Sequence, residues 1–214
     1  MKNKGILFVV SGPSGAGKST LYKEVSSSLP NLKHPVSYTT RQPRKGEVND
    51  RDYTFISKQE FIEMIERGEF AEWAEIHGEL YGTSKKRLEE AMNVGTDVIL
   101  DIDVQGANQL RKRYRGGVYI FILPPSIEVL KERLEKRKAD AKEDIEKRLS
   151  VASEEIKRYR EYDYVIVNRA LKDALKELTA IITSKRLSSK RVDPEWIKTN
   201  FLRGGKNGNC ISTN

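Results

Sequence analysis

The chain has 214 residues, 39 of them basic and 31 acidic, a length that suits one sizeable core with small appended lobes. No apolar run approaches the ~20 residues that cross a bilayer, and the single cysteine, Cys210, can form no internal disulfide, so we expect a water-soluble, cytoplasmic protein without membrane contact. The net charge of +8 suits any polyanion, which leaves nucleotides and nucleic acid open as ligands.

The segment 12–20 organises the rest of the chain, because it satisfies the phosphate-loop pattern of Gly, four residues and Gly-Lys-Ser/Thr. An apolar strand over 5–10 precedes it, and an apolar face at helical spacing follows it. Such a bend points consecutive N–H groups inward and predicts a polyphosphate site. Lys18 would reach the β- and γ-phosphates, and Ser19 would join the shell of a Mg²⁺ ion. The residues expected to bind ATP here are Gly12, Pro13, Ser14, Gly15, Ala16, Gly17, Lys18, Ser19 and Thr20.

A short strand over 35–40 leads into a loop over 41–55 that has an unusual density of functional side chains for a connecting segment. Arg41 and Arg44 flank a proline and can present two planar guanidinium groups to one tetrahedral anion. A solvated charged loop is the alternative interpretation of this stretch, and the phosphate loop upstream favours the anion site.

A helix and two strands are predicted next. Ser57 and Glu60 have the spacing of a capping box, and the helix that they open stops at Gly68. Strands are expected over 69–76 and 77–83. These elements indicate a small inserted lobe that carries many polar groups, as a substrate clamp would.

Ser84 opens a further helix that closes at Gly95, and a buried strand over 96–102 follows. Its carboxyl end carries Asp101 and Asp103. Acids at the carboxyl end of a parallel strand emerge where open α/β sheets bind ligands. In phosphoryl transfer such an acid helps to hold Mg²⁺ through water or orients the acceptor.

The remaining elements continue the alternation of strand and helix. The basic run 111–115 is interpreted as a solvated helix end rather than a nucleic-acid site. Strands are predicted over 118–123 and 164–167, a helix capped by Ser126 follows the first of them, and a helix over 171–187 follows the second. Together they predict a parallel sheet with right-handed crossovers.

The segment 126–159 has the makings of a hinged lid. Arg133 and Arg137 crowd the end of its first helix, 139–141 breaks the pattern, and Arg148 lies near the start of the second helix. Arginines brought over a polyphosphate by closure would neutralise charge and exclude water. Two ordinary surface helices with paired charges are the alternative.

Several separate motifs, in order and spacing, resemble the guanylate kinase family. They lie at 11–20, 36–47, 52–55, 81–83, 99–106 and 147–149, within a similarity that runs from about 5 to 187. The resemblance implies a three-layer α/β P-loop NTPase fold with a central parallel sheet, an inserted small mixed α/β lobe that binds GMP, and a helical lid. The corresponding parts are a core of 1–35, 84–125 and 160–187, a GMP-binding lobe of 36–83, a lid of 126–159 and a polar, basic tail of 188–214.

The resemblance also implies a Mg²⁺-dependent transfer of the γ-phosphoryl group from ATP to GMP or dGMP, by a monomer or homo-oligomer that binds no nucleic acid. The residues that it assigns to GMP are Ser37, Arg41, Arg44, Tyr53 and Tyr81 around the phosphate, Glu72, Thr83 and Asp101 on the guanine side, and Glu47 as a further GMP-binding residue. Guanine offers N–H donors that an ionised Glu accepts, whereas adenine would place an acceptor there. The other assigned residues are Arg133, Arg137 and Arg148 at the lid and transfer site, Asp103 near the metal and acceptor, and Asn168 near the adenine.

Two other functions share some of these features. A non-catalytic guanylate-kinase-like module that binds phosphopeptides would use the arginine-rich lobe, but such modules have degenerate phosphate loops and this loop is complete. A basic P-loop ATPase acting on nucleic acid would consume ATP without GMP and would bind in a salt-dependent way. After Arg137 the chain departs from the family's usual Gly and small polar residues, which leaves the shape of the lid tip open.

Overall fold

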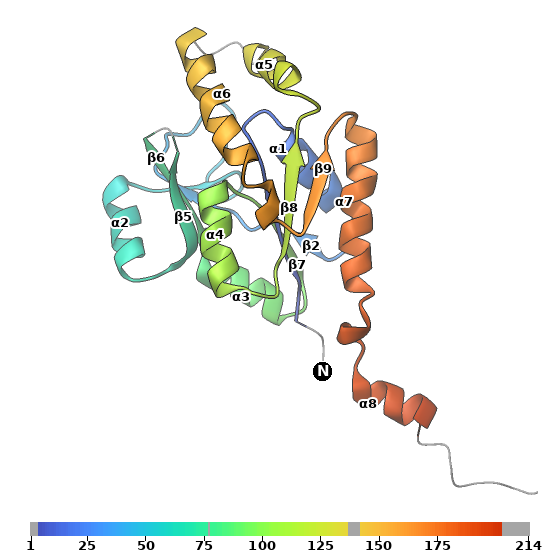
Figure 1. The fold of residues 1–214 in the computed structure, drawn as a ribbon. Helices are drawn as coiled ribbons and strands as arrows, with labels where there is room; N and C mark the ends of the chain where they lie inside the picture. The colour runs from blue at the N-terminus through green and yellow to red at the C-terminus, as the bar shows by residue number, and fades with distance from the viewer. Residues whose placement is uncertain (1–3, 77, 137–141, 203–214) are drawn as a thin grey trace, which may run out of the picture.

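The computed structural model describes residues 4–76, 78–136 and 142–202, with the side chains of 142–144 excepted. A five-stranded parallel sheet with the order β2-β7-β1-β8-β9 forms its centre (Figure 1). The strands are β1 (Leu7–Ser11), β2 (Leu32–Lys33), β7 (Asp97–Asp101), β8 (Val118–Leu123) and β9 (Tyr164–Val167). Four of them were predicted, whereas the two-residue β2 was not.

Helices cover both faces of this sheet and produce the expected three-layer α/β arrangement. One face packs against α1 (Lys18–Ser28) and α7 (Leu171–Arg186). The other packs against α3 (Lys85–Asn93) and α4 (Val104–Arg113). β1 lies in the middle of the sheet and is buried throughout, so the loop that follows it is held from both sides by the core.

The second sheet has the order β4-β3-β6-β5 and is smaller. Its strands are β3 (Tyr38–Thr39), β4 (Thr54–Phe55), β5 (Phe70–Ile76) and β6 (Glu79–Ser84). Helix α2 (Lys58–Glu66) packs on it through Phe61 and Met64. Ser57 caps this helix by accepting a hydrogen bond from the Glu60 N–H, as the capping box predicts. Ser84 caps α3 in the same way, and Ser126 likewise caps α5 (Ile127–Glu135).

Helices α5 (Ile127–Glu135) and α6 (Lys142–Ile156) pack against each other beyond the carboxyl end of β8 (Figure 1). Their shared apolar cluster contains Leu130, Leu134 and Ile145. The predicted bend over 139–141 and Arg137 lie outside the described residues. A 3₁₀ turn, η1 (Tyr159–Glu161), connects α6 to β9.

The polar tail contains helical turns that were not among the predicted elements. They are η2 (Ser189–Arg191), α8 (Pro194–Ile197) and η3 (Lys198–Leu202), and Asp193 caps α8. In Figure 1 this segment extends away from the sheet. Within the part of the chain that the structure describes, every helix is too short or too polar to cross a membrane.

A buried carboxylate ties the last helix of the core to the sheet. Asp97 begins β7 and is 3% exposed. It accepts hydrogen bonds from Ile6 N at 2.7 Å and from Arg186 Nε at 2.7 Å. Arg186 also donates to the Pro30 carbonyl at 2.9 Å. One carboxylate thus joins the β1 and β7 strands to the end of α7.

Replacing Asp97 with Ala should lower the free energy of unfolding by about 3 kcal/mol, because it leaves Arg186 and a buried N–H without their partner. Urea unfolding followed by far-UV circular dichroism measures this loss. Asp173→Ala is the matched control, since Asp173 pairs with Lys176 on the surface of α7 and should change stability by less than about 1 kcal/mol. Equal effects of the two substitutions would contradict the role given to Asp97.

Candidate active site

The phosphate loop is shaped by glycines whose backbone no other residue adopts easily. Gly12 has φ +143° and Gly17 has φ +94°. A Cβ on Gly12 would lie 2.2 Å from the Ile122 carbonyl oxygen, and one on Gly17 would lie 2.3 Å from Asn168 Nδ2. Substitution would therefore push the loop away from the sheet. Lys18 opens α1 and its Nζ donates to the Gly12 carbonyl at 2.6 Å, which folds its side chain back over the loop.

Three polar side chains from distant parts of the chain converge on this loop. Asn168 is 6% exposed and donates from Nδ2 to the Ala16 carbonyl at 2.8 Å. Arg133 Nη2 donates to the Asn168 carbonyl at 3.0 Å, and Arg148 Nη2 donates to Ser14 Oγ at 2.7 Å. The structure therefore brings two of the three expected lid arginines to the phosphate loop.

Asp101 lies beside the start of α1. Ser19 Oγ donates to Asp101 Oδ2 at 2.8 Å, so a hydroxyl and a carboxylate stand together there. Such oxygen atoms fit Mg²⁺, which is usually held by one or two protein groups together with phosphate oxygens and water. The resemblance assigns Asp101 to the guanine side, and in the structure its hydrogen bond is with the expected metal ligand.

Asp103 lies two residues further on, close to Glu72. It caps α4 by accepting a hydrogen bond from Gly106 N at 2.8 Å. A Cβ on Gly106 would lie 2.4 Å from Glu72 Oε2 and 3.1 Å from Asp103 Oδ1, so both carboxylates reach the same point on the helix. Asp103 is expected near the metal and the acceptor, and in the structure its neighbour is the acid expected to contact guanine.

Glu72 is held in an environment that disfavours its charge. Its side chain comes from β5, is 4% exposed and accepts a hydrogen bond from Thr83 Oγ1 at 2.5 Å. Burial is the main cause that raises the pKa of Glu72 to about 7. The hydrogen bond from Thr83 opposes this shift, and the negative charge of Asp103 contributes to it. Burial also raises the pKa of Asp103. A ligand that donates hydrogen bonds here would stabilise the ionised form of Glu72.

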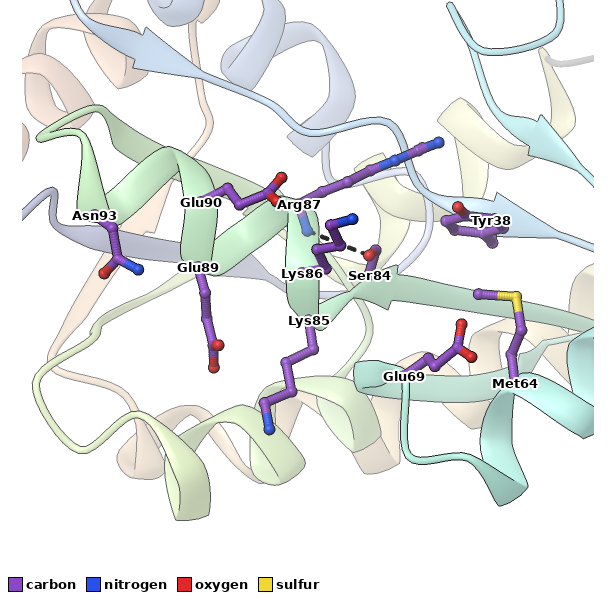
Figure 2. Close-up of a pocket in the computed structure, with 10 residues that line it drawn as sticks. All are labelled: Tyr38, Met64, Glu69, Ser84, Lys85, Lys86, Arg87, Glu89, Glu90 and Asn93. Carbon is purple, nitrogen blue, oxygen red and sulfur yellow. Dashed lines mark hydrogen bonds between the residues drawn. The ribbon is translucent and has the colours of Figure 1, made fainter.

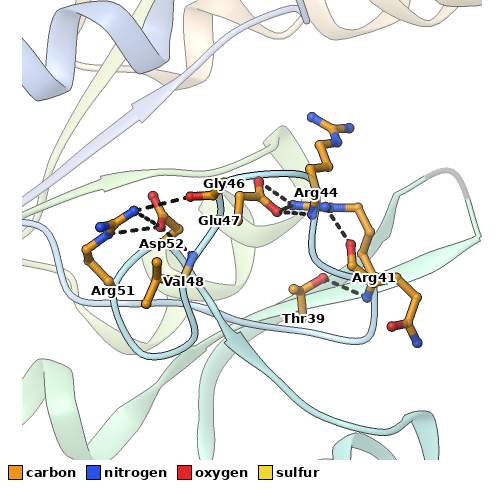
Figure 3. Close-up of polar contacts among 9 residues, drawn as sticks. Thr39, Arg41, Arg44, Gly46, Glu47, Val48, Arg51 and Asp52 are labelled. Carbon is orange, nitrogen blue, oxygen red and sulfur yellow. Dashed lines mark hydrogen bonds and ion pairs between the residues drawn. The ribbon is translucent and has the colours of Figure 1, made fainter.

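The loop that carries Arg41 and Arg44 is organised by Glu47 (Figure 3). Arg41 Nη2 donates to both oxygens of Glu47, at 2.9 and 3.0 Å, and the Arg44 backbone N–H donates to Oε2 at 2.7 Å. The Arg44 side chain points away from this pair in Figure 3. Glu47 is expected among the GMP ligands. In the structure it binds the Arg41 side chain and the Arg44 backbone, and these hydrogen bonds stabilise the loop.

Two tyrosines complete this side. The rings of Tyr53 and Tyr81 meet edge to face with centroids 6.0 Å apart, and the Arg41 guanidinium lies 5.5 Å from the Tyr53 ring centre. The backbone carbonyl of Ser37 accepts from Thr54 N at 2.8 Å, which places Ser37 next to Tyr53. The structure thus brings Ser37, Arg41, Tyr53 and Tyr81 close together, whereas the Arg44 side chain points away from them.

A cavity of about 700 Å³ lies elsewhere, between the start of α3 and the small sheet (Figure 2). None of the predicted site residues lines it. Arg87, on its wall, donates to the Val36 carbonyl at 3.2 Å and to Thr54 Oγ1 at 2.8 Å, and lies 4.7 Å from the Tyr38 ring centre. Arg87 therefore stabilises the loop through contacts near both of its ends. The sequence does not reveal this role, because Arg87 stands in a run of basic residues.

A phosphate loop at the end of a buried parallel strand, with two arginines close to it, is typical of P-loop phosphotransferases. The sequence profile of the guanylate kinase family matches residues 4–185. The chain is 54% identical to the guanylate kinase of Geobacter metallireducens over 192 residues, which cover 90% of this chain and 95% of that protein. It is 46% identical to the guanylate kinase of Thermotoga maritima over 183 residues, covering 86% and 88%.

The crystal structure of guanylate kinase from Anaplasma phagocytophilum superimposes with a TM-score of 0.77 at 33% identity, covering 94% of this chain and 97% of that one. The chain therefore belongs to the guanylate kinase family, the nucleoside monophosphate kinases that the sequence motifs predict. The family assignment and the α/β fold class are thereby confirmed.

The raised pKa of Glu72 makes stability depend on pH. The folded carboxyl keeps its proton up to about pH 7, whereas the unfolded one loses it near its ordinary pKa of 4.5. The folded state binds more protons between these values, so the wild type loses stability as the pH rises through them. Glu72→Gln escapes this loss and should gain up to about 3 kcal/mol relative to the wild type between about pH 4 and pH 8.

Urea unfolding of both proteins at several pH values measures this gain. Glu66→Gln is the control, because Glu66 is an exposed carboxylate on α2 and its replacement should give a difference that hardly varies with pH. If the advantage of Glu72→Gln is the same at both ends of the pH range, Glu72 is not a carboxyl with a raised pKa.

Proposed function

We propose that this guanylate kinase aligns ATP over the phosphate loop and GMP over the small sheet, and transfers the γ-phosphoryl group directly between them to give ADP and GDP. The observation that carries the proposal is the separation of the polar residues into two sets. One set gathers at the phosphate loop around Lys18, and the other lies on the small sheet and includes Arg41, two tyrosines and the buried Glu72. Alignment and charge stabilisation suffice for phosphoryl transfer, so no covalent intermediate is needed.

On the donor side, backbone N–H groups of the loop and Lys18 would bind the β- and γ-phosphates. Arg133 and Arg148 already contact the loop through Asn168 and Ser14, so they are placed to neutralise the charge that spreads over the moving phosphoryl group. Ser19 and Asp101 would hold Mg²⁺, which neutralises phosphate charge when bound. Closure of α5 and α6 over the loop would keep water from accepting the phosphoryl group.

On the acceptor side, Arg41, Arg44, Tyr53 and Tyr81 would bind the GMP phosphate. Glu47 fixes the Arg41 guanidinium before the substrate arrives, which reduces the entropy lost on binding. Glu72 and Thr83 of the lobe, together with Asp103 at the start of α4, would bind the guanine. The N1–H and N2–H groups of guanine are donors, so they would satisfy Glu72 in its ionised form, whereas adenine would set its N1 acceptor against it.

Replacing Lys18 with Ala should lower kcat by about 10²- to 10³-fold, as expected for one preorganised cationic donor. The affinity for GMP should be largely unchanged, because GMP binds through the other set of residues. Steady-state ADP production and equilibrium binding of GMP measure the two effects. Lys23→Ala is the control, since Lys23 is exposed on the same helix; a Lys18→Ala enzyme with a near-normal rate would remove Lys18 from the mechanism.

A panel of nucleoside monophosphates tests how the base is read. With ATP and Mg²⁺ the wild type should produce ADP with GMP and far less with AMP, CMP or UMP. Glu72→Gln should raise KM for GMP by roughly 10- to 100-fold and narrow the preference over AMP, because an amide has one acceptor oxygen and adds donors. Glu75→Gln is the control on the same strand, where Glu75 is exposed. Unchanged GMP selectivity in Glu72→Gln would mean that another group reads the base.

A further inference from the structure

The strand that carries Glu72 contains an irregularity immediately before it. Strand β5 pairs with β6 in the antiparallel sense, and the register shifts between Phe70 and Glu72. Phe70 lies opposite Ser84 and Glu72 lies opposite Thr83, so β5 has one residue more than β6 over this stretch. This is a β-bulge, and the extra residue is Ala71. Bulges commonly re-aim a side chain next to an active site.

The bulge lies directly beside Glu72. From Glu72 to Ile76 the ladder is regular, so Glu72 lies opposite Thr83, shares a face with it and accepts its hydroxyl hydrogen bond. On the other side of the bulge the pairing is displaced by one residue, and Phe70 lies opposite Ser84. Glu72 thus stands where two stretches of different register meet, so the position of its carboxylate depends on how the backbone on both sides is held.

Helix α4 holds the bulge from outside the sheet. Strand β5 is an edge strand, and its outer backbone groups pair with side chains of α4. Arg113 Nη1 donates to the carbonyls of Phe70 and Ala71, at 2.7 and 2.9 Å. On the other side of Glu72, Gln109 Nε2 donates to the Trp73 carbonyl at 2.6 Å, and its Oε1 accepts from Trp73 N at 3.2 Å.

We propose that Gln109 and Arg113 are positioning residues for base selection, which fix the backbone on both sides of Glu72 and so aim its carboxylate at the guanine edge. The inference rests on the proposed role of Glu72. The same helix supplies Gly106, against which the Glu72 carboxylate packs, and Asp103 at its cap. One helix thus sets both the position of the strand and the position of the second acid.

The test compares GMP with IMP, whose base lacks the 2-amino group of guanine. Gln109→Met keeps the length of the side chain and removes both hydrogen bonds to Trp73. It should lower the preference for GMP over IMP by about tenfold, the loss expected when one hydrogen bond to the base is misaligned, and leave KM for ATP unchanged. The ratio of kcat/KM for the two substrates does not depend on how much of the enzyme is folded, so general destabilisation would not move it.

The control is Gln59→Met, because Gln59 on α2 bonds only to Glu63 among its described contacts and should leave the ratio unchanged. Arg113→Met provides a second variant with the same expected effect if Gln109→Met expresses poorly. The double variant Gln109→Met with Glu72→Gln should show no further loss beyond that of Glu72→Gln, because both changes act through one carboxylate.

Other outcomes distinguish the positioning role of Gln109 and Arg113 from the recognition of guanine by Glu72. If Glu72→Gln lowers the GMP preference but Gln109→Met and Arg113→Met do not, the positioning role is wrong and Glu72 still reads the base. A Gln109→Met effect of equal size with and without Glu72 would also overturn the positioning role. If none of the three substitutions changes the preference, the reading of guanine by Glu72 fails, and the inference fails with it.

Discussion

The backbone of the phosphate loop is the constraint on which the rest of the site depends. A chain that turns all its N–H groups toward one anion must adopt positive φ values and approach its neighbours closely, and only glycine permits both at Gly12 and Gly17. The loop can keep this shape because β1 lies at the centre of a buried parallel sheet. Asn168, at the end of β9, donates a hydrogen bond to the Ala16 carbonyl. The position of the loop therefore also depends on β9.

The burial of Glu72 is a second constraint, and it opposes stability. Glu72 is almost fully buried, and burial raises its pKa. Thr83 compensates part of its charge, and in the proposed function guanine would compensate the remainder. The buried Asp97 at the start of β7 differs, because its partner Arg186 belongs to the protein itself. One buried carboxylate thus stabilises the fold through a partner in the protein, whereas the other would, in the proposed function, find its partner in the substrate.

The sequence predicts elements well where the signal is local. Capping serines, apolar periodicity and the phosphate-loop spacing are each determined within a few residues, and α2, α3 and α5 begin where Ser57, Ser84 and Ser126 indicate. The roles of Asp101 and Asp103 could not be separated this way. Asp101 is still in the strand and meets Ser19, whereas Asp103 has left it to cap α4. Arg113 was read as part of a solvated helix end, because its partners are carbonyls more than forty positions away.

The two edges of the small sheet are attached to different helices of the core, and this bears on how the site can work. At one edge side chains of α4 bind the β5 backbone around Glu72, and the same helix is capped by Asp103. Near the other edge, Arg87 of α3 binds Val36 and Thr54, which flank Ser37 and Tyr53. In the proposed function, recognition of the base and of the acceptor phosphate would therefore depend on separate supports. Because those supports share no residue, substitutions in one should add to substitutions in the other, whereas substitutions within one should not.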